Sequence, residues 1–126
     1  RSGREELISA RSALLVEGSE KIGDMSLISK VYDNFDFKAL SHLGSHISNN
    51  YERVVQIYGI SNDGLGQFII SKSKDINIDL GNVYKQLAGE FKLKGGGNTN
   101  TVQGSVPTVN LDSLLQRARE IITQGL

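Results

Sequence analysis

Apolar residues recur along the chain in two patterns. Spacings of three, four and seven predict helices over about 5–21, from Phe37, over 80–91 and from Leu111. Runs rich in branched and aromatic residues predict strands at 25–32, 53–60 and 66–71, and the order leaves room for a short strand before the last helix. Residues 61–64 (SNDG) have the turn chemistry of an antiparallel hairpin. Together these elements predict a single α/β domain, a mixed β-sheet with an antiparallel hairpin, backed by helices.

Single residues predict where the helices begin and end. Gly23 is placed to end the first helix, because glycine accepts the left-handed conformation common just past a helix. Asp36 and Asn110 are predicted N-caps. Asp75 and Asp79 lie near a helix start, where the helix dipole favours a negative charge, so capping is the predicted role of this pair.

The first helix carries an apolar stripe at a spacing of seven. This stripe fits a helix that packs on its own domain, or one that packs on a partner helix. Its residues are Leu7, Ile8, Leu14, Leu15 and Ile22.

Composition narrows the classes of protein. The 126 residues fit one domain, and no apolar run approaches the roughly 18 residues of a membrane helix, so no membrane partner is expected. The absence of cysteine excludes disulfides and thiolate chemistry and fits a cytoplasmic protein. Fourteen basic and fourteen acidic residues cancel, so a nucleic-acid partner would need a local basic patch. The chain begins Arg1-Ser2-Gly3, without an initiator methionine, and we expect a piece of a longer protein.

The most informative segment is the glycine-rich stretch at 92–104 (KLKGGGNTNTVQG). Three consecutive glycines are entropically costly, so they indicate either a place where no side chain fits or a close approach of backbone to a ligand. Free amides there would suit phosphate oxygens. Residues 71–94 hold five lysines and three acids, an excess of two positive charges. The segment alone fits a ligand-binding loop or a flexible linker, and the charge fits a nucleic-acid surface or a solvated helix face.

Catalytic signatures are weak or missing. His42 and His46 would share one helix face, but zinc needs three or four protein ligands and the chain has no cysteine and no third histidine. We interpret the pair as part of a solvated polar face. Neither the P-loop spacing nor G-x-G-x-x-G occurs, and the carboxylates form no acyl-transfer or glycosidase pattern. The sequence predicts no catalytic residue, no metal ligand and no cofactor in this chain.

From about residue 19 to 122, the order of elements and the segment KGGGNTNTVQGS resemble the DHH-associated domain. This domain ends alanyl-tRNA synthetases and many DHH phosphoesterases, and it follows the editing domain in some AlaX-type alanyl-tRNA editing proteins. Its signature is matched by Gly95, Gly96, Gly97, Gln103 and Gly104.

The chain also departs from the signature. Asn98 stands where synthetases usually carry arginine and phosphoesterases often carry histidine, and Thr99-Asn100 replaces a common Pro-Asp. Ser105 replaces the second glycine of a pair, whereas Gln103 looks more like the synthetase and editing branch.

The resemblance implies a connector helix at 1–22 and a DHH-associated domain at 23–126. It implies binding of tRNA-Ala or another RNA, an upstream domain in the same polypeptide, and a homodimer in some members. The parent would be an aminoacyl-tRNA deacylase or an alanine-tRNA ligase. The alternative is the substrate-binding domain of a DHH phosphoesterase that acts on oligonucleotides or cyclic dinucleotides. Zinc would belong to a parent's editing domain, or manganese to a phosphoesterase domain.

In this interpretation the glycine-rich segment and its lysines form the nucleic-acid-binding site. The lysines supply charge, Gly95 to Asn98 present backbone donors, and Asn100 and Gln103 orient the contacts. The full set is Lys72, Lys92, Lys94, Gly95, Gly96, Gly97, Asn98, Asn100, Thr101, Gln103 and Gly104.

Overall fold

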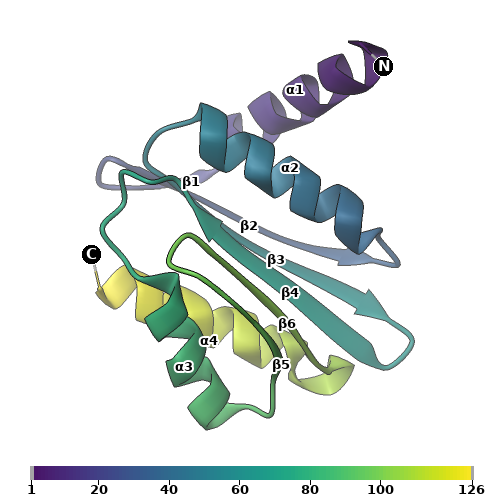
Figure 1. The fold of residues 1–126 in the computed structure, drawn as a ribbon, viewed down its shortest axis with the longest axis vertical. Helices are drawn as coiled ribbons and strands as arrows, with labels where there is room; N and C mark the ends of the chain where they lie inside the picture. Colours follow the sequence, from purple (N-terminus) through teal and green to yellow (C-terminus); the bar gives the residue numbers. More distant parts are fainter. Residues whose placement is uncertain (1, 126) are drawn as a thin grey trace.

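A mixed six-stranded β-sheet with helices on both faces forms the centre of the molecule (Figure 1), in a computed structural model that describes residues 2–125. The helices are α1 Ser2–Glu17, α2 Phe37–Asn50, α3 Leu80–Glu90 and α4 Leu111–Gln124. The strands are β1 Glu20–Ile22, β2 Met25–Asp33, β3 Val54–Asn62, β4 Leu65–Lys72, β5 Lys94–Gly97 and β6 Thr101–Pro107. The predicted α/β fold class is confirmed.

The strand order is β1-β2-β3-β4-β6-β5, and only β2 and β3 run parallel. A parallel pair needs a crossover connection, which α2 supplies. The predicted hairpin joins β3 to β4 through Asp63 and Gly64, whose φ angles are 41° and 86°. Positive φ at both central residues is typical of a type I′ turn, for which Asp-Gly is a preferred pair.

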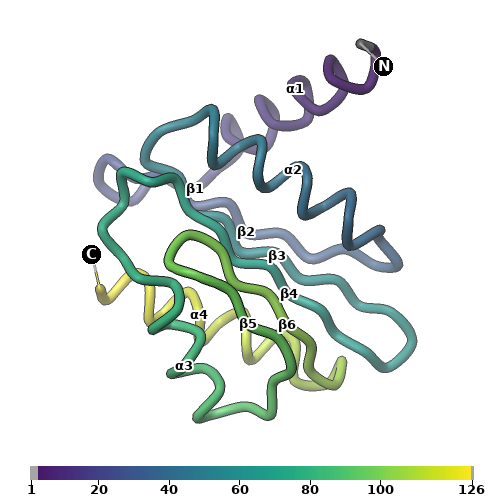
Figure 2. The backbone as a smooth tube through the Cα atoms, in the orientation of Figure 1, coloured from purple at the N-terminus to yellow at the C-terminus, as the bar shows by residue number. Residues whose placement is uncertain are grey.

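Two apolar cores lie on opposite faces of the sheet. One packs the sheet against α3 and α4, and the other packs it against α1 and α2. The tube in Figure 2 shows the two helix layers, with α1 and α2 on one side of the strands. The central strand β3 is buried from Val54 to Ile60, which explains why it is mostly apolar and does not alternate, with Gln56 buried among the apolar residues. Among residues 2–125, no helix has the length and hydropathy needed to cross a membrane.

Two of the predicted helix caps are confirmed. The Asp36 carboxylate accepts from Lys38 N at 3.0 Å and the Asp79 carboxylate accepts from Gly81 N at 2.9 Å. Asn110 occupies the N-cap position of α4 as predicted, but a 3₁₀ turn (Thr108–Asn110) leads into the helix and the Asn110 side chain makes no capping bond.

The predicted end of the first helix is wrong. Helix α1 ends at Glu17, where Gly18 N donates to Leu14 O at 3.0 Å. Residues 20–22 instead pair with β2 as an edge strand, and Gly23, at φ 62°, lies in the β1–β2 turn. Ile22 therefore packs on the α3–α4 side of the sheet, so its spacing of seven from Leu15 is a coincidence.

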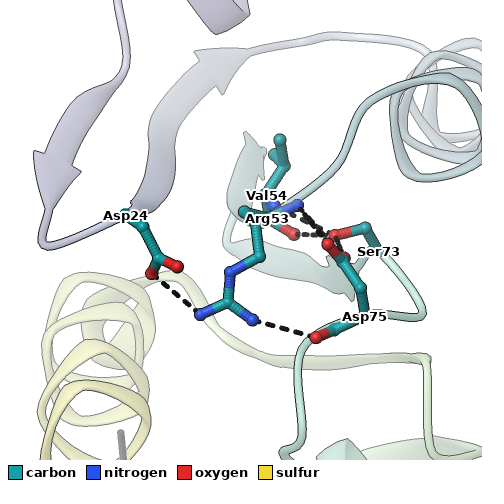
Figure 3. A network of polar contacts seen from close by, with 5 residues as sticks. All are labelled: Asp24, Arg53, Val54, Ser73 and Asp75. Atoms are coloured by element: carbon teal, nitrogen blue, oxygen red, sulfur yellow. Dashed lines mark hydrogen bonds and ion pairs between the residues drawn. The ribbon is translucent and has the colours of Figure 1, made fainter.

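Asp75 is not a helix cap but part of a polar network at the start of β3 (Figure 3). Its carboxylate accepts from Arg53 N at 3.1 Å and from Ser73 Oγ at 2.6 Å. The Arg53 guanidinium donates to Asp75 O at 2.9 Å and to Asp24 Oδ1 at 3.0 Å. Ser73 Oγ also accepts from Val54 N, so the network joins the β1–β2 turn to the ends of β3 and β4.

Candidate nucleic-acid interface

One half of the α2-facing side of the sheet is left uncovered by α2 and is polar. Ile69 of β4 packs beneath α2, and Gln103 of β6 lies directly opposite Ile69 in the register, so both face the same side. Alternation along β4, β5 and β6 then places the buried Ser71 and the exposed Leu65 and Pro107 on this side, together with six further residues that are polar or glycine. We call this surface the open face: Gln67, Lys94, Gly96, Thr101, Gln103 and Ser105.

The glycine triplet is neither the loop nor the linker that the sequence allows, because it forms the edge strand β5. Gly95 and Gly97 have φ angles of 154° and 156°, which side chains rarely adopt. A Cβ at Gly95 would collide with Gln103 O, and one at Gly97 with Thr101 O, whereas a Cβ at Gly96 would meet open space. Two of the three glycines are therefore required by the approach of β6, and Gly96 is free of that constraint.

The outer edge of β5 carries unpaired backbone donors. Asn98 N donates to Thr101 O at 2.8 Å. Bonded and non-bonded pairs alternate in an antiparallel ladder, so Gly96 and Gln103 form the next bonded pair. The amides of Gly95 and Gly97 then point away from β6, beyond which the described sheet has no further strand.

The β5–β6 turn is held by its own side chains. Asn98 Oδ1 accepts from Asn100 N at 2.9 Å and from Thr101 N at 3.0 Å. The carbonyl of Thr99 accepts from Leu80 N at 2.9 Å, which ties the turn to the start of α3. The predicted residues Asn98 and Asn100 thus shape the turn.

Lys72 lies beneath this turn rather than on the surface. Its side chain is buried, with the residue 3% exposed, and Nζ donates to Asn100 Oδ1 at 2.8 Å. Burial lowers the pKa of the Lys72 ammonium, and the negative charges of Asp75 and Asp79 partly offset that effect. The residue tethers the turn to the end of β4.

The other predicted residues separate into two groups. Lys92, Lys94, Thr101 and Gln103 are exposed, and the two lysines form no ion pair among residues 2–125. Gly104 lies opposite Phe68 on the α3–α4 side, where a Cβ would come within 2.9 Å of the Phe68 ring. Gly104 therefore makes room for the core and does not contribute to the open face.

Helix α2 forms a polar wall beside the open face, which sequence reasoning missed. A hollow of about 330 Å³ separates Gln103 from Lys38, Ser41, His42 and Ser45. These four residues recur at spacings of three, four and seven, which could have identified one continuous helix face. His42 is exposed and His46 half-buried, and residues 2–125 contain no cluster of three or more metal-ligating side chains.

The apolar stripe on α1 is divided between core and surface. Ile8 and Leu15 pack against the α2-side core, as expected for a helix on its own domain. Leu7 and Leu14 are 52% and 68% exposed. The alternative that the stripe packs on a partner helix therefore concerns Leu7 and Leu14 only.

The geometry can be compared with known proteins. The DHHA1 domain model matches residues 24–124. An alanine–tRNA ligase of Psychrobacter sp. (strain PRwf-1) is 28% identical over 106 residues, which cover 82% of this chain and 12% of that protein. The C-Ala domain from Aquifex aeolicus alanyl-tRNA synthetase has a TM-score of 0.70 at 21% identity, over 82% of this chain and 96% of that one. RecJ in complex with Mg²⁺ from Thermus thermophilus has a TM-score of 0.59 at 12% identity, over 98% of this chain and 18% of that one.

The fold is a single α/β domain with a mixed sheet that ends in a glycine edge strand. The chain belongs to the DHHA1 domain family, which confirms the family expected from the sequence. It spans about one-eighth of the length of the alanine–tRNA ligase that it matches. Because the solved structures are 21% identical or less, they show the shared fold alone.

Proposed function

We propose that this chain is the C-terminal tRNA-binding domain of an alanyl-tRNA synthetase or an alanyl-tRNA editing protein, and that it is non-catalytic by itself. The open face carries the proposal. It is a polar half-sheet without a covering helix, bordered by an edge strand with outward amides and by lysines that form no ion pair among residues 2–125. Such a surface suits the phosphates and 2′-hydroxyls of RNA.

The predicted residues take two roles in this proposal. Lys92 and Lys94 supply charge to phosphates, and the outward amides of Gly95 and Gly97 donate to phosphate oxygens. Gln103 orients a sugar or base contact, with Thr101 beside it, and Gly96 allows close approach of the RNA backbone.

A second group of residues positions the contacts without touching RNA. Asn98, Asn100 and Lys72 hold the β5–β6 turn through the bonds described above. In the intact parent, an aminoacyl-tRNA deacylase or an alanine-tRNA ligase, an upstream domain carries out the chemistry on the same tRNA.

Salt-dependent binding of a tRNA-Ala transcript tests the proposal. The full chain is titrated by fluorescence anisotropy between about 50 and 200 mM salt, where a protein that contacts several phosphates loses orders of magnitude in affinity. Lys94→Gln should lower the salt slope by about one. Lys85→Gln removes the same charge at an exposed position of α3, on the other side of the sheet, and should leave the slope unchanged. Undetectable binding at tens of micromolar, or binding that ignores salt, contradicts the proposal.

The phosphoesterase alternative has only the shared fold in its support. Asn98 stands where the resemblance expects histidine in that branch, and its carboxamide is committed to closing the turn. The parent gene discriminates between the two. A D-H-H motif upstream would favour the phosphoesterase, whereas an H-x-x-x-H and C-x-x-x-H pair would favour the editing protein.

A further inference from the structure

A groove of about 420 Å³ lies between α1 and α2. Helix α1 lies on the far side of α2 from strands β5 and β6 (Figure 1). Its floor is apolar and is formed by Leu7 and Ile8 of α1 with Ala39 and Leu43 of α2. The volume lies within the range of about 300–1,000 Å³ that is typical of small-molecule sites. No residue predicted to bind nucleic acid lines this groove.

Three positively charged side chains line the groove. Arg4, Arg11 and Lys38 line it and take part in none of the ion pairs among residues 2–125. The one acid in the lining, Asp36, is engaged as the cap of α2. The other arginines in the described range are all paired: Arg53 with Asp24, Arg117 with Glu90 and Arg119 with Glu20.

An aromatic pair contributes one ring to the lining of the groove. Phe35 lines it and stacks on Tyr32, with ring centroids 4.7 Å apart. Burial raises the pKa of the Tyr32 hydroxyl, and the nearby Arg11 charge partly offsets this. A guanidinium thus lies close to an aromatic and apolar surface. This combination suits a ligand that joins an anionic group to a flat, weakly polar ring.

The groove and the open face share one wall. Lys38 and His42 of α2 line the groove, and both also line the hollow opposite Gln103. One strand of RNA can therefore contact both surfaces by crossing α2. A second copy of this chain, placed groove against groove, would bring three cations of each copy together, which disfavours that occupant.

We propose that the α1–α2 groove binds one unpaired nucleotide of the RNA that contacts the open face. The base lies on the apolar floor and the adjoining phosphate pairs with Arg4 and Arg11. This inference rests on the proposed RNA-binding function and adds a second contact to it. Arginine suits the role because its planar guanidinium pairs with phosphate in a bidentate manner.

Binding and crosslinking of the full chain to tRNA-Ala test the groove. Arg11→Gln is compared with Lys85→Gln, which removes one charge from exposed α3. Loss of one phosphate contact lowers the salt slope by about one, which is about tenfold in affinity at 0.1 M salt. Lys85→Gln should change affinity less than about twofold. Urea unfolding verifies that both variants are folded, and Arg4→Gln serves as a second groove variant.

Photocrosslinking locates the contact independently of charge. RNA with 4-thiouridine at unpaired positions is irradiated on the wild-type chain, and the adducts are mapped by mass spectrometry. We expect adducts on residues 3–11 and 35–43, and their loss in Arg11→Gln.

The results separate the two proposals. Equal affinity of Arg11→Gln and Lys85→Gln, with no groove adduct, overturns the groove and leaves RNA binding by the open face standing. A wild-type chain that binds no RNA overturns both. Capture of an acidic amphipathic peptide instead of RNA, or self-association that depends on Leu7, assigns the groove another occupant and also overturns the inference.

Discussion

The two halves of the α2-facing side of the sheet have opposite chemistry. Under α2, strands β2 and β3 present Ile28, Val54, Tyr58 and Ile60, and each is 2% exposed or less. On the open face, Thr101 and Gln103 of β6 point to the same side of the sheet as those four residues, and both are exposed. The same sheet therefore supplies a core on one half and an aqueous surface on the other.

The difference shows that the apolar and polar pattern of a strand indicates which of its faces are buried. Strand β3 is covered on both faces and is mostly apolar, with Gln56 buried among the apolar residues, whereas β6 alternates because only its α3–α4 side is buried. Val102 and Val106 fill that core, and the residues between them are polar or glycine. An alternating strand beside a fully buried one therefore marks the part of a sheet that is available to a partner.

Truncation of a covered residue is expected to have the largest effect on stability. Leu40 of α2 is 0% exposed beneath the covered half, so Leu40→Ala should lower the free energy of unfolding by about 2–5 kcal/mol. Gln103→Ala on the open face should change it by less than about 0.5 kcal/mol. Urea denaturation measures both, and a comparable loss for Gln103→Ala would show that the open face is part of the folded core.

Two adjacent glycines should respond differently to the same substitution. Gly95→Ala places a methyl group in the backbone of β6 at a positive φ and should cost about 2–3 kcal/mol of stability. Gly96→Ala meets open space and should cost less than about 0.5 kcal/mol. If the RNA backbone approaches Gly96 closely, the stable Gly96→Ala protein should bind tRNA-Ala more weakly than wild type, which fluorescence anisotropy measures. Equal stability of the two variants would mean that β5 does not pair with β6 as described.

The fold was largely predictable because most elements have a local cause. The helix periodicity, the Asp36 cap and the Asp63-Gly64 turn all act within a few residues of chain. The errors arose where a tertiary contact decided the outcome. Residues 20–22 leave the helix because β2 offers them an edge, and the glycine triplet becomes a strand because β6 lies against it.

The candidate site was predictable in content but not in arrangement. Composition identified the glycine-rich segment, and the structure adds that Gly95 and Gly97 serve the strand pairing while Lys72 serves the turn. Burial of a lysine beneath a turn leaves no mark in its own sequence neighbourhood. The basic groove between α1 and α2 was equally hidden, because Arg4 and Lys38 come together only through packing of the two helices.

The smallest expected effect concerns a polar residue at the margin of the covered half, Asp75. The hydrogen bond from Ser73 Oγ, followed by that from Arg53 N, lowers the pKa of the Asp75 carboxyl below its ordinary value. The folded state thus binds this proton less readily than the unfolded chain does. The charged carboxylate therefore stabilises the fold above the unfolded pKa of about 3.9, and this contribution disappears as pH falls through the lower folded pKa. Because Asp75 is exposed, we expect Asp75→Asn to cost no more than about 1 kcal/mol at pH 7.

The pH dependence distinguishes this network from the polar residues of the open face. The difference in free energy of unfolding between wild type and Asp75→Asn should be constant from pH 7 to about pH 5 and should shrink as the solution becomes more acidic. Urea denaturation at several pH values measures it, with Asp33→Asn, an exposed carboxylate outside the network, as the matched control. A difference that persists unchanged at low pH would assign the effect of Asp75 to packing rather than to its charge. The polar network would then resemble the covered half, which is held by shape, and not the open face, where polar groups remain available to solvent and ligand.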